Sequence, residues 1–334
     1  MSTTLGTANF TQFEKGFFIT EAVIGLDTIN KGLAYVASGV KNDQYTFPQL
    51  TANTKLKAYT PTPGGQTSST ALSNRNVNLG KFQAYEEFDP SIFENHWHQG
   101  ELSDKLMARA LPATFANYLG AWYTQKTLVP VELMLHQGSI SYLTTSGGSA
   151  EPGVGANESL VHFDGIIKQA LNASTPAIQV ASPVALTSAN IIAKMELAKN
   201  SMSKALLSKA DRYKRLKFLL SVEDGQKYED ALTNTSFKNN DTTEAGLNRY
   251  KGYTVEILAG LPENTFYFCE ATTDVQSNIH MCVTSMDNLS FNIDRLQANS
   301  ELYFYKAVAK MGVGISKPAE FVIYTTKTLA SFSA

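Results

Sequence analysis

Two histidines separated by one residue are the feature of this sequence most similar to a metal site. On a strand, His96 and His98 would point to the same side, as two ligands of one metal ion do. No third ligand can be identified near them, and such a pair is more often a surface or hydrogen-bonding feature. The sequence therefore predicts no metal, and a metal-dependent hydrolase that uses His96 and His98 remains an alternative.

Cys269 and Cys282 are the only cysteines, which is too few for a disulfide framework and indicates a reducing compartment. They fall in two predicted strands that are neighbours in the sequence. Cys269 could therefore meet His280 and Cys282 across a sheet. Buried thiols usually behave as small apolar side chains, however. We predict no catalytic cysteine and no cofactor.

Charged side chains gather in two further places. Five cations lie near the end of a predicted helix, where they suit the helix dipole: Lys209, Arg212, Lys214, Arg215 and Lys217. Phosphate binding is one interpretation, but we favour a solvated helix end paired with nearby acids: Glu223, Asp224, Glu229 and Asp230. The second group consists of four acids at the base of the predicted arm: Glu86, Glu87, Asp89 and Glu94. Such carboxylates could act as an acid–base pair, but we interpret them as an ordinary polar rim. No Walker motif, dinucleotide fingerprint or nucleophile elbow is present, so we predict that the protein is not an enzyme.

The composition of the 334 residues is that of a soluble globular chain, with 43% hydrophobic and 17% charged residues. A formal net charge of −2 gives no electrostatic argument for a dedicated nucleic-acid binder or a membrane-surface protein. No apolar run of about 20 residues could span a bilayer, and the first residues lack the pattern of a secretory signal. We expect no membrane partner.

The stretch 41–90 has the pattern of a long hairpin arm. In its outgoing limb, Tyr45–Thr60, the apolar residues Leu50, Ala52, Leu56 and Ala58 share one parity, as in a strand with one face covered. In the returning limb, Asn76–Phe88, the apolar residues have odd numbers before Gly80 and even numbers after it. This change predicts a bulge at Gly80. The tip between the limbs, Thr60–Thr70, consists of turn-formers and small hydroxyl residues.

The length of this arm suggests that it needs a partner. A limb of about 15 residues spans about 50 Å, which equals the diameter of a compact chain of this size. A two-stranded hairpin is marginal alone in water, so an arm that leaves the body must lie on another molecule. An ordinary hairpin folded across its own domain is the alternative. The expected contact residues of the arm are Leu50, Leu56, Tyr59, Pro61, Pro63, Gly64, Gly65, Val77, Leu79 and Phe82, and those of the N-terminus are Phe10, Phe13, Phe17 and Phe18.

In the rest of the chain, the sequence predicts helices followed by strands. This order is typical of the α+β fold class. Apolar periodicity predicts helices over Glu21–Val36, Glu101–Gly138, Thr187–Ala210 and Glu223–Leu232. Pro130 is expected to kink the second helix or to start a new segment, and Thr187 or Ser188 to cap the third. The predicted strands are Phe218–Val222, Tyr253–Leu258, Thr265–Cys269, Ile279–Thr284, Leu289–Ile293, Glu301–Gly314 and Phe321–Thr325.

In this order of elements the chain resembles the major capsid proteins of tailed bacteriophages, which have the Hong Kong 97 fold. Residues 41–90 resemble the family's extended loop, and Glu101–Gly138 its spine helix. Three further stretches are similar to family segments: His162–Ile167, Phe218–Tyr228 and Tyr250–Val255. Leu302–Ile315, followed by Pro318 and Ala319, is similar to the closing strand.

The resemblance implies an N-terminal arm (1–40), an extended loop (41–90), a peripheral domain (91–180), an axial domain (181–285) and return strands of the peripheral domain (286–334). It implies a major capsid protein that assembles into pentamers and hexamers of an icosahedral head in the host cytoplasm and becomes part of the virion. The implied partners are further copies of the chain, packaged double-stranded DNA bound without sequence specificity, a portal, a separate scaffolding protein and, where present, decoration proteins. An encapsulin-like bacterial cage is an alternative with the same fold.

Overall fold

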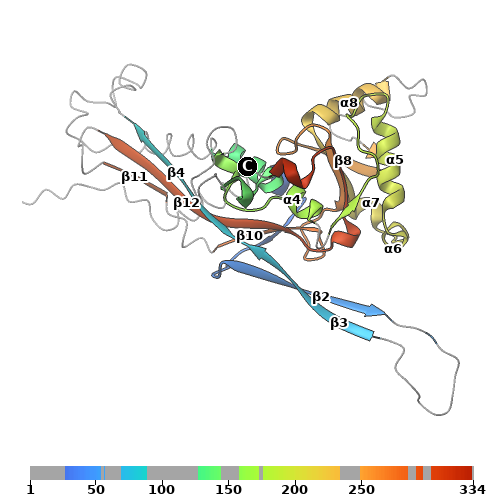
Figure 1. The fold of residues 1–334 in the computed structure, drawn as a ribbon, viewed down its shortest axis with the longest axis horizontal. Coiled ribbons are helices and arrows are strands. Elements are labelled where there is room, and N and C mark those ends of the chain that lie inside the picture. Colours follow the sequence, from blue (N-terminus) through green and yellow to red (C-terminus); the bar gives the residue numbers. More distant parts are fainter. Residues whose placement is uncertain are drawn as a thin grey trace, which may run out of the picture.

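The structure, a computed structural model, describes residues 27–53, 56, 69–88, 127–143, 158–172, 176–233, 249–284, 291–295 and 302–332. Two sheets and a projecting hairpin organise them (Figure 1). The five-stranded sheet contains β1 (Tyr35–Ala37), β10 (Ile279–Val283), β12 (Tyr303–Ile315), β11 (Phe291–Arg295) and β4 (Gly80–Phe88). Its long strand β12 pairs antiparallel with β10 at one end, with β11 at the other, and with all of β4 along its second edge.

The six-stranded sheet forms the centre of the compact body. Its order is β5 (Ile178–Gln179), β13 (Val322–Thr325), β9 (Thr265–Glu270), β6 (Leu216–Ser221), β8 (Tyr253–Leu258) and β7 (Arg249–Tyr250). Every residue of β9 is buried, because a core cluster covers each face. Tyr267 and Cys269 join one cluster, and Phe266 and Phe268 the other, as the alternation of side chains along a strand requires.

Helices cover both faces of this sheet. One cluster receives α4 (Ile166–Leu171) and a helix over residues 127–137, and the other receives α5 (Ile191–Ser201) and α8 (Val222–Thr233). The shorter helices are α2 (Asp27–Asn30), α6 (Lys204–Leu207) and α7 (Arg212–Arg215), and the 3-10 turns are η3 (Ile140–Leu143), η4 (Glu158–Leu160), η6 (Pro318–Glu320) and η7 (Leu329–Phe332). In Figure 1, α5, α6 and α8 lie at the end of the body opposite β11.

The predicted helix Thr187–Ala210 is shorter than expected. Ile191, Met195 and Ala198 are fully buried on the face that the spacing indicated. The helix ends at Ser201, because Met202 takes an extended backbone (ψ 147°), and α6 begins only at Lys204. Asn190, in place of Thr187 or Ser188, occupies the N-cap position, and its side-chain oxygen accepts a hydrogen bond from the backbone of Thr187 at 2.8 Å.

The prediction of a helix over Glu21–Val36 is wrong in its second half. Helix α2 ends at Asn30, and Gly32 has a φ of +61°, a conformation that suits glycine and ends the helix. Tyr35–Ala37 then forms β1, parallel to β10. Of the predicted helix Glu101–Gly138, residues 127–137 are helical and continue through Pro130, and residues 101–126 lie outside the described part of the chain.

The chain changes sheets on both sides of the expected domain boundary at residues 285 and 286. β10, which the sequence assigned to the axial domain, belongs to the five-stranded sheet, and β13, which was assigned to the peripheral return strands, belongs to the six-stranded sheet. Among the described strands the chain therefore crosses between these two sheets three times: between Phe88 and Ile178, between Glu270 and Ile279, and between Ile315 and Val322. Short strands carry no sequence signal for which sheet they join.

The returning limb Asn76–Phe88 is divided between two sheets. It pairs with the outgoing limb only as far as Asn78, and from Gly80 it runs beside β12 as β4. The predicted bulge is therefore a transfer from the hairpin to the body. A Cβ atom at Gly80 would lie 1.9 Å from the backbone oxygen of His162, so only glycine fits at this crossing.

We expect Gly80→Ala to destabilise the chain by about 2 kcal/mol or more, because backbone on both sides must shift. Thermal or urea unfolding followed by circular dichroism measures the change. Gly39→Ala is the matched control for the loss of a glycine, since no atom lies within 4 Å of an added Cβ there, although its φ of +83° adds local strain. An unchanged midpoint in Gly80→Ala would contradict the close crossing.

Candidate functional site: the exposed face of the projecting arm

The arm is a two-stranded hairpin of β2 (Gln44–Asn53) and β3 (Ser69–Asn78) that projects from the body (Figure 1). The register runs from Gln44 opposite Asn78 to Asn53 opposite Ser69. Ten residues at about 3.3 Å each make this paired part roughly 33 Å long. No third strand joins the hairpin in the described part of the chain, so its two faces decide what it can bind.

One face of the arm is anchored to the body at its base. Phe47, Val77 and Leu79 are buried together with Val40 and Cys282. The ring of His280 lies between two aromatic side chains there, with its centroid 4.4 Å from that of Phe47 and 5.1 Å from that of Tyr35. The body therefore covers odd-numbered residues of β2. The sequence pattern had instead predicted that the even-numbered residues would be covered.

Two glycines of β12 allow the arm to cross closely. A Cβ at Gly314 would lie 2.1 Å from the side chain of Val77, and a Cβ at Gly312 would lie 2.5 Å from the backbone oxygen of Asn78. Lys310, two residues before Gly312, forms an ion pair with Asp43 beside β2. The backbone N–H of Leu79 donates to the carbonyl oxygen of Asp43 at 2.8 Å. The base of the arm is thus held by packing, an ion pair and a backbone hydrogen bond.

The opposite face of the arm is exposed along its whole described length. Gln44 and Thr46 donate hydrogen bonds to Asn78 and Asn76, at 3.0 and 2.8 Å. Farther out, Leu50 and Leu72 lie directly opposite each other, and each is 70% exposed. Leu56, beyond the end of β2, is 98% exposed. Water-exposed leucines paired across an isolated hairpin form an apolar surface that no described residue of the chain covers.

The sequence-predicted contact residues fall into three groups. Leu50 and Leu56 lie on the exposed part of the arm, as expected for contact residues. Val77 and Leu79 are buried inside the chain, and Phe82 is half-buried with its ring 5.5 Å from that of His162, so these three hold the arm and β4 to the body. Tyr59, Pro61, Pro63, Gly64, Gly65, Phe10, Phe13, Phe17 and Phe18 lie outside the described residues. Leu72 was missed, because the predicted returning limb began only at Asn76.

Within the described ranges, the side chains with potential chemistry do not form a reactive group. Cys269 lies in the six-stranded sheet, and His280 and Cys282 lie in the five-stranded one, so the predicted meeting across a sheet is wrong. Burial raises the pKa of Cys282 to about 12 and raises that of Cys269 further, which keeps both thiols protonated at neutral pH. Burial lowers the pKa of His280, which keeps its imidazole neutral. Among the described residues, no group of His, Cys, Asp and Glu could hold a metal; His96, His98, Asp89 and Glu94 are outside them.

The charged clusters also differ from the prediction. Arg215 pairs with Glu270, Asp274 and Asp211, and Lys217 with Glu256, instead of with the four acids that the sequence suggested. Asp224 pairs with Lys227, which also pairs with Glu263. Glu86 and Glu87 lie exposed on β4, where Glu87 accepts a hydrogen bond from Tyr85 at 2.5 Å.

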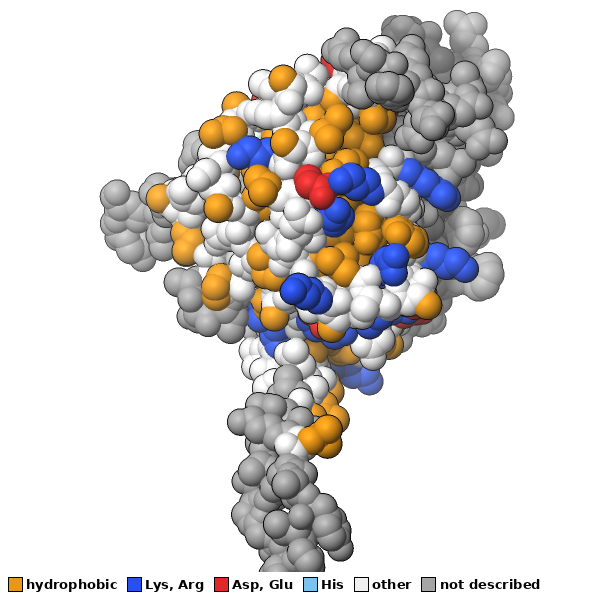
Figure 2. Space-filling view, turned by 90° about the vertical axis from the view of Figure 1, so that its right-hand side faces the viewer, with side chains coloured by type: hydrophobic (Ala, Val, Ile, Leu, Met, Phe, Trp, Pro, Cys, Tyr) orange, Lys and Arg blue, Asp and Glu red, His pale blue; other side chains and the backbone are white. Residues whose placement is uncertain are grey.

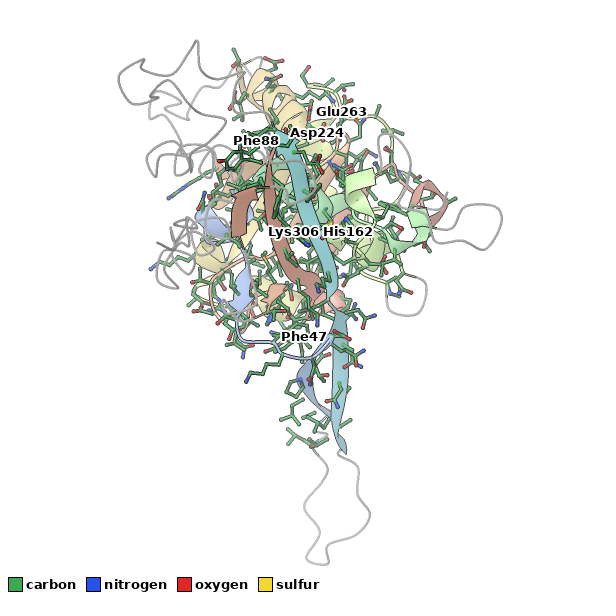
Figure 3. All side chains as sticks on the ribbon, turned by 90° about the vertical axis from the view of Figure 1, so that its left-hand side faces the viewer. Phe47, Phe88, His162, Asp224, Glu263 and Lys306 are labelled. Carbon is green, nitrogen blue, oxygen red and sulfur yellow. The ribbon has the colours of Figure 1, made fainter. Side chains whose placement is uncertain are left out.

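An open groove of about 860 Å³ runs between the sheet pair β4–β12 and the helix over residues 127–137. Figure 3 shows His162 and Lys306 beside this pair of strands, with Phe47 toward the arm and Phe88 at the far end of β4. Burial lowers the pKa of His162, whose ring stacks on Phe82. In the described part of the chain no helix is both long and apolar enough to cross a membrane.

Comparisons with known proteins are informative only at the level of structure. No protein-family model matches the sequence, and no curated protein sequence matches it. A chain of the satellite phage P4 procapsid including the size determination protein aligns with a TM-score of 0.60 at 9% identity, covering 96% of this chain and 92% of that one. A chain of Gordonia phage Cozz aligns with a TM-score of 0.53 at 12% identity, covering 90% and 86%. A capsid chain of a native GTA particle aligns with a TM-score of 0.52 at 10% identity, covering 98% and 94%.

These alignments extend over nearly the whole of both chains, so they concern the complete architecture and not one shared motif. The chain has the Hong Kong 97-like capsid fold, an α+β architecture, as its order of elements indicated.

Proposed function

We propose that the chain is a major capsid protein, a structural and non-catalytic protein whose copies assemble into an icosahedral shell. The projecting arm supports this proposal most directly, because one of its faces is anchored to the body and the other exposes Leu50 and Leu72. A second copy of the chain is the occupant we assign to this face. The fold shared with shell-forming chains supports this assignment.

The physical requirements of a shell support the same function. A closed shell needs heterologous contacts that close by rotation, and an arm laid across a neighbour provides such a contact. A net charge of −2 leaves little self-repulsion between identical subunits. Pentamers and hexamers in the host cytoplasm, enclosed double-stranded DNA, a portal and a separate scaffolding protein complete the proposal. The thiols of Cys269 and Cys282 and the imidazole of His280 are buried, and the proposed function requires none of them.

Electron microscopy of the purified chain tests the proposal. We expect closed shells of uniform size, whose contents after nuclease treatment are nuclease-protected DNA when the shells are purified from infected or induced cells. Shells filled with a protein cargo would instead support the encapsulin-like alternative. Rings or tubes would indicate a tail or connector component. A compact monomer at high protein concentration would exclude a shell-forming function altogether.

A further inference from the structure

The face of the body formed by α5, α6 and α7 carries an excess of positive charge. Between Ile191 and Arg215 the sequence has seven basic residues and two acidic ones, in a chain whose net charge is −2. Figure 2 looks onto the side of the molecule where these helices lie, and Lys and Arg side chains clearly outnumber Asp and Glu on it. The segment is therefore a local basic surface in an otherwise nearly neutral protein.

Both acids of this segment already have cationic partners. Glu196 accepts hydrogen bonds from Lys199 at 2.7 Å, from Lys251 and from Tyr250, and these lower its pKa to about 2. Asp211 lies 3.7 Å from Arg215, which also pairs with Glu270. The acids therefore do not neutralise the remaining cations of the segment.

Five cations remain without an acidic partner within 4 Å in the described part of the chain. Lys194 donates to the carbonyl oxygen of Ser182 at 3.1 Å, and the other four are Lys204, Lys209, Arg212 and Lys214. The three lysines are exposed and occur every five residues. The guanidinium of Arg212 lies 4.4 Å from the centre of the Tyr213 ring and donates to its hydroxyl at 2.9 Å, so this cation is held at the surface. We call these four residues the basic face.

The composition of the basic face fits a phosphate backbone better than a protein. Three of the exposed side chains between the lysines are small, at Ala205, Ser208 and Ala210, and Leu206 points into the core. The one exposed aromatic ring between them, that of Tyr213, carries the guanidinium of Arg212 over its face. Protein interfaces are depleted in lysine and need apolar or aromatic anchors in a buried centre. Contacts to DNA phosphates are made mainly by lysine and arginine and need no groove.

We infer that the basic face binds the phosphate backbone of double-stranded DNA and lines the interior of the shell. This inference rests on the proposed function and assigns the DNA contact to one surface. Four phosphate contacts give a slope of about −3.6 in log K against log salt concentration, which is a loss of roughly 100-fold in affinity per site between about 50 and 200 mM salt. Such contacts hold the DNA without reading its sequence.

The test compares two double variants with equal loss of charge. Lys209→Gln/Lys214→Gln removes half of the basic face, and Lys41→Gln/Lys81→Gln removes two exposed lysines from the arm base and β4. Binding of a short labelled duplex to unassembled subunits is measured by fluorescence anisotropy over a salt series. We expect the slope to become smaller by about 1.8 in the first variant and to stay unchanged in the second. Equal slopes in the wild type and the first variant, or equal reductions in both variants, would overturn the inference.

Two further measurements separate this inference from the proposed function. Closed shells should not bind duplex added from outside, because the basic face is then enclosed; binding to intact shells would place the face outside and contradict the inference. Binding of an acidic polypeptide in preference to the duplex would assign the face to a protein partner instead. In either case wild-type shells seen by electron microscopy would leave the shell-forming function intact.

Discussion

The double substitution Leu50→Asp/Leu72→Asp should leave the chain folded and prevent it from assembling. Both side chains are 70% exposed in the isolated chain, so their replacement removes almost no internal packing. In the shell that we propose, a neighbouring copy covers the same face, and two unpaired charges would be buried there. Burial of an unpaired charge costs about 3 kcal/mol or more, so each arm contact should weaken by at least roughly 100-fold.

Size-exclusion chromatography and electron microscopy measure assembly, and thermal unfolding measures the fold. The matched control is Gln49→Asp/Ser73→Asp, which places two aspartates opposite each other on the other face of the same hairpin. We expect nearly normal shells from the control. Normal shells from the leucine variant, or an equal loss of assembly in both, would show that the exposed leucine pair is not the contact.

The second large effect concerns the fold itself. Met195→Asp should prevent the chain from folding, because Met195 is fully buried between α5 and the six-stranded sheet. An unpaired charge in this core costs an amount comparable with the whole stability of a domain, about 5–15 kcal/mol. The same should hold for Met202→Asp, since Met202 is only 3% exposed.

Soluble yield, circular dichroism and resistance to protease measure this effect. Leu197→Asp is the control, since Leu197 lies on the same helix two residues away and is 47% exposed. Met195→Leu keeps the volume and the apolar character and should cost less than about 1.5 kcal/mol. A soluble, folded Met195→Asp chain would disprove the packing of α5 against the sheet.

Local patterns predicted the elements in which burial follows a simple period. The strand Tyr253–Leu258 is observed with the predicted bounds, and the buried positions Ile191, Met195 and Ala198 follow helical spacing. The same reasoning failed at Val36, where an i, i+4, i+7 spacing occurs by chance in a turn and a short strand. A parallel pairing such as that of β1 with β10 depends on a segment more than 240 residues away, which no local pattern contains.

The candidate site was predicted in outline and misread in detail. The alternation around Leu50 identified the arm, but parity alone does not say which face the body covers. The buried odd face is decided by Phe47 and Val77, which meet His280, Cys282 and Gly314 from the other end of the chain. Leu72 was missed because the Thr60–Thr70 tip suggested a turn centred near residue 65, whereas the observed register, with Leu50 opposite Leu72, is centred at residue 61.

The charge of the basic face was visible in the sequence but was assigned to the wrong partners. Net charge describes the whole chain and conceals a local excess, and proximity in sequence suggested Glu223 and Asp224 as the neutralising acids. In the structure α8 turns Asp224 toward Lys227 and the backbone N–H of Thr265, away from the lysines of α6 and α7. Ion pairing depends on side-chain direction, which a sequence does not specify.

The run of β3 directly into β4 has a mechanical consequence. Figure 1 shows the two strands following one line, from the arm into the body. Tension on the arm would therefore act along β4, whose nine residues all pair with β12. Hydrogen bonds in an antiparallel pair lie across the strands, so this load strains the whole ladder in shear at once instead of peeling it apart bond by bond. If the proposed shell comes under pressure from its contents, the two-stranded hairpin should give way before β4 leaves the body.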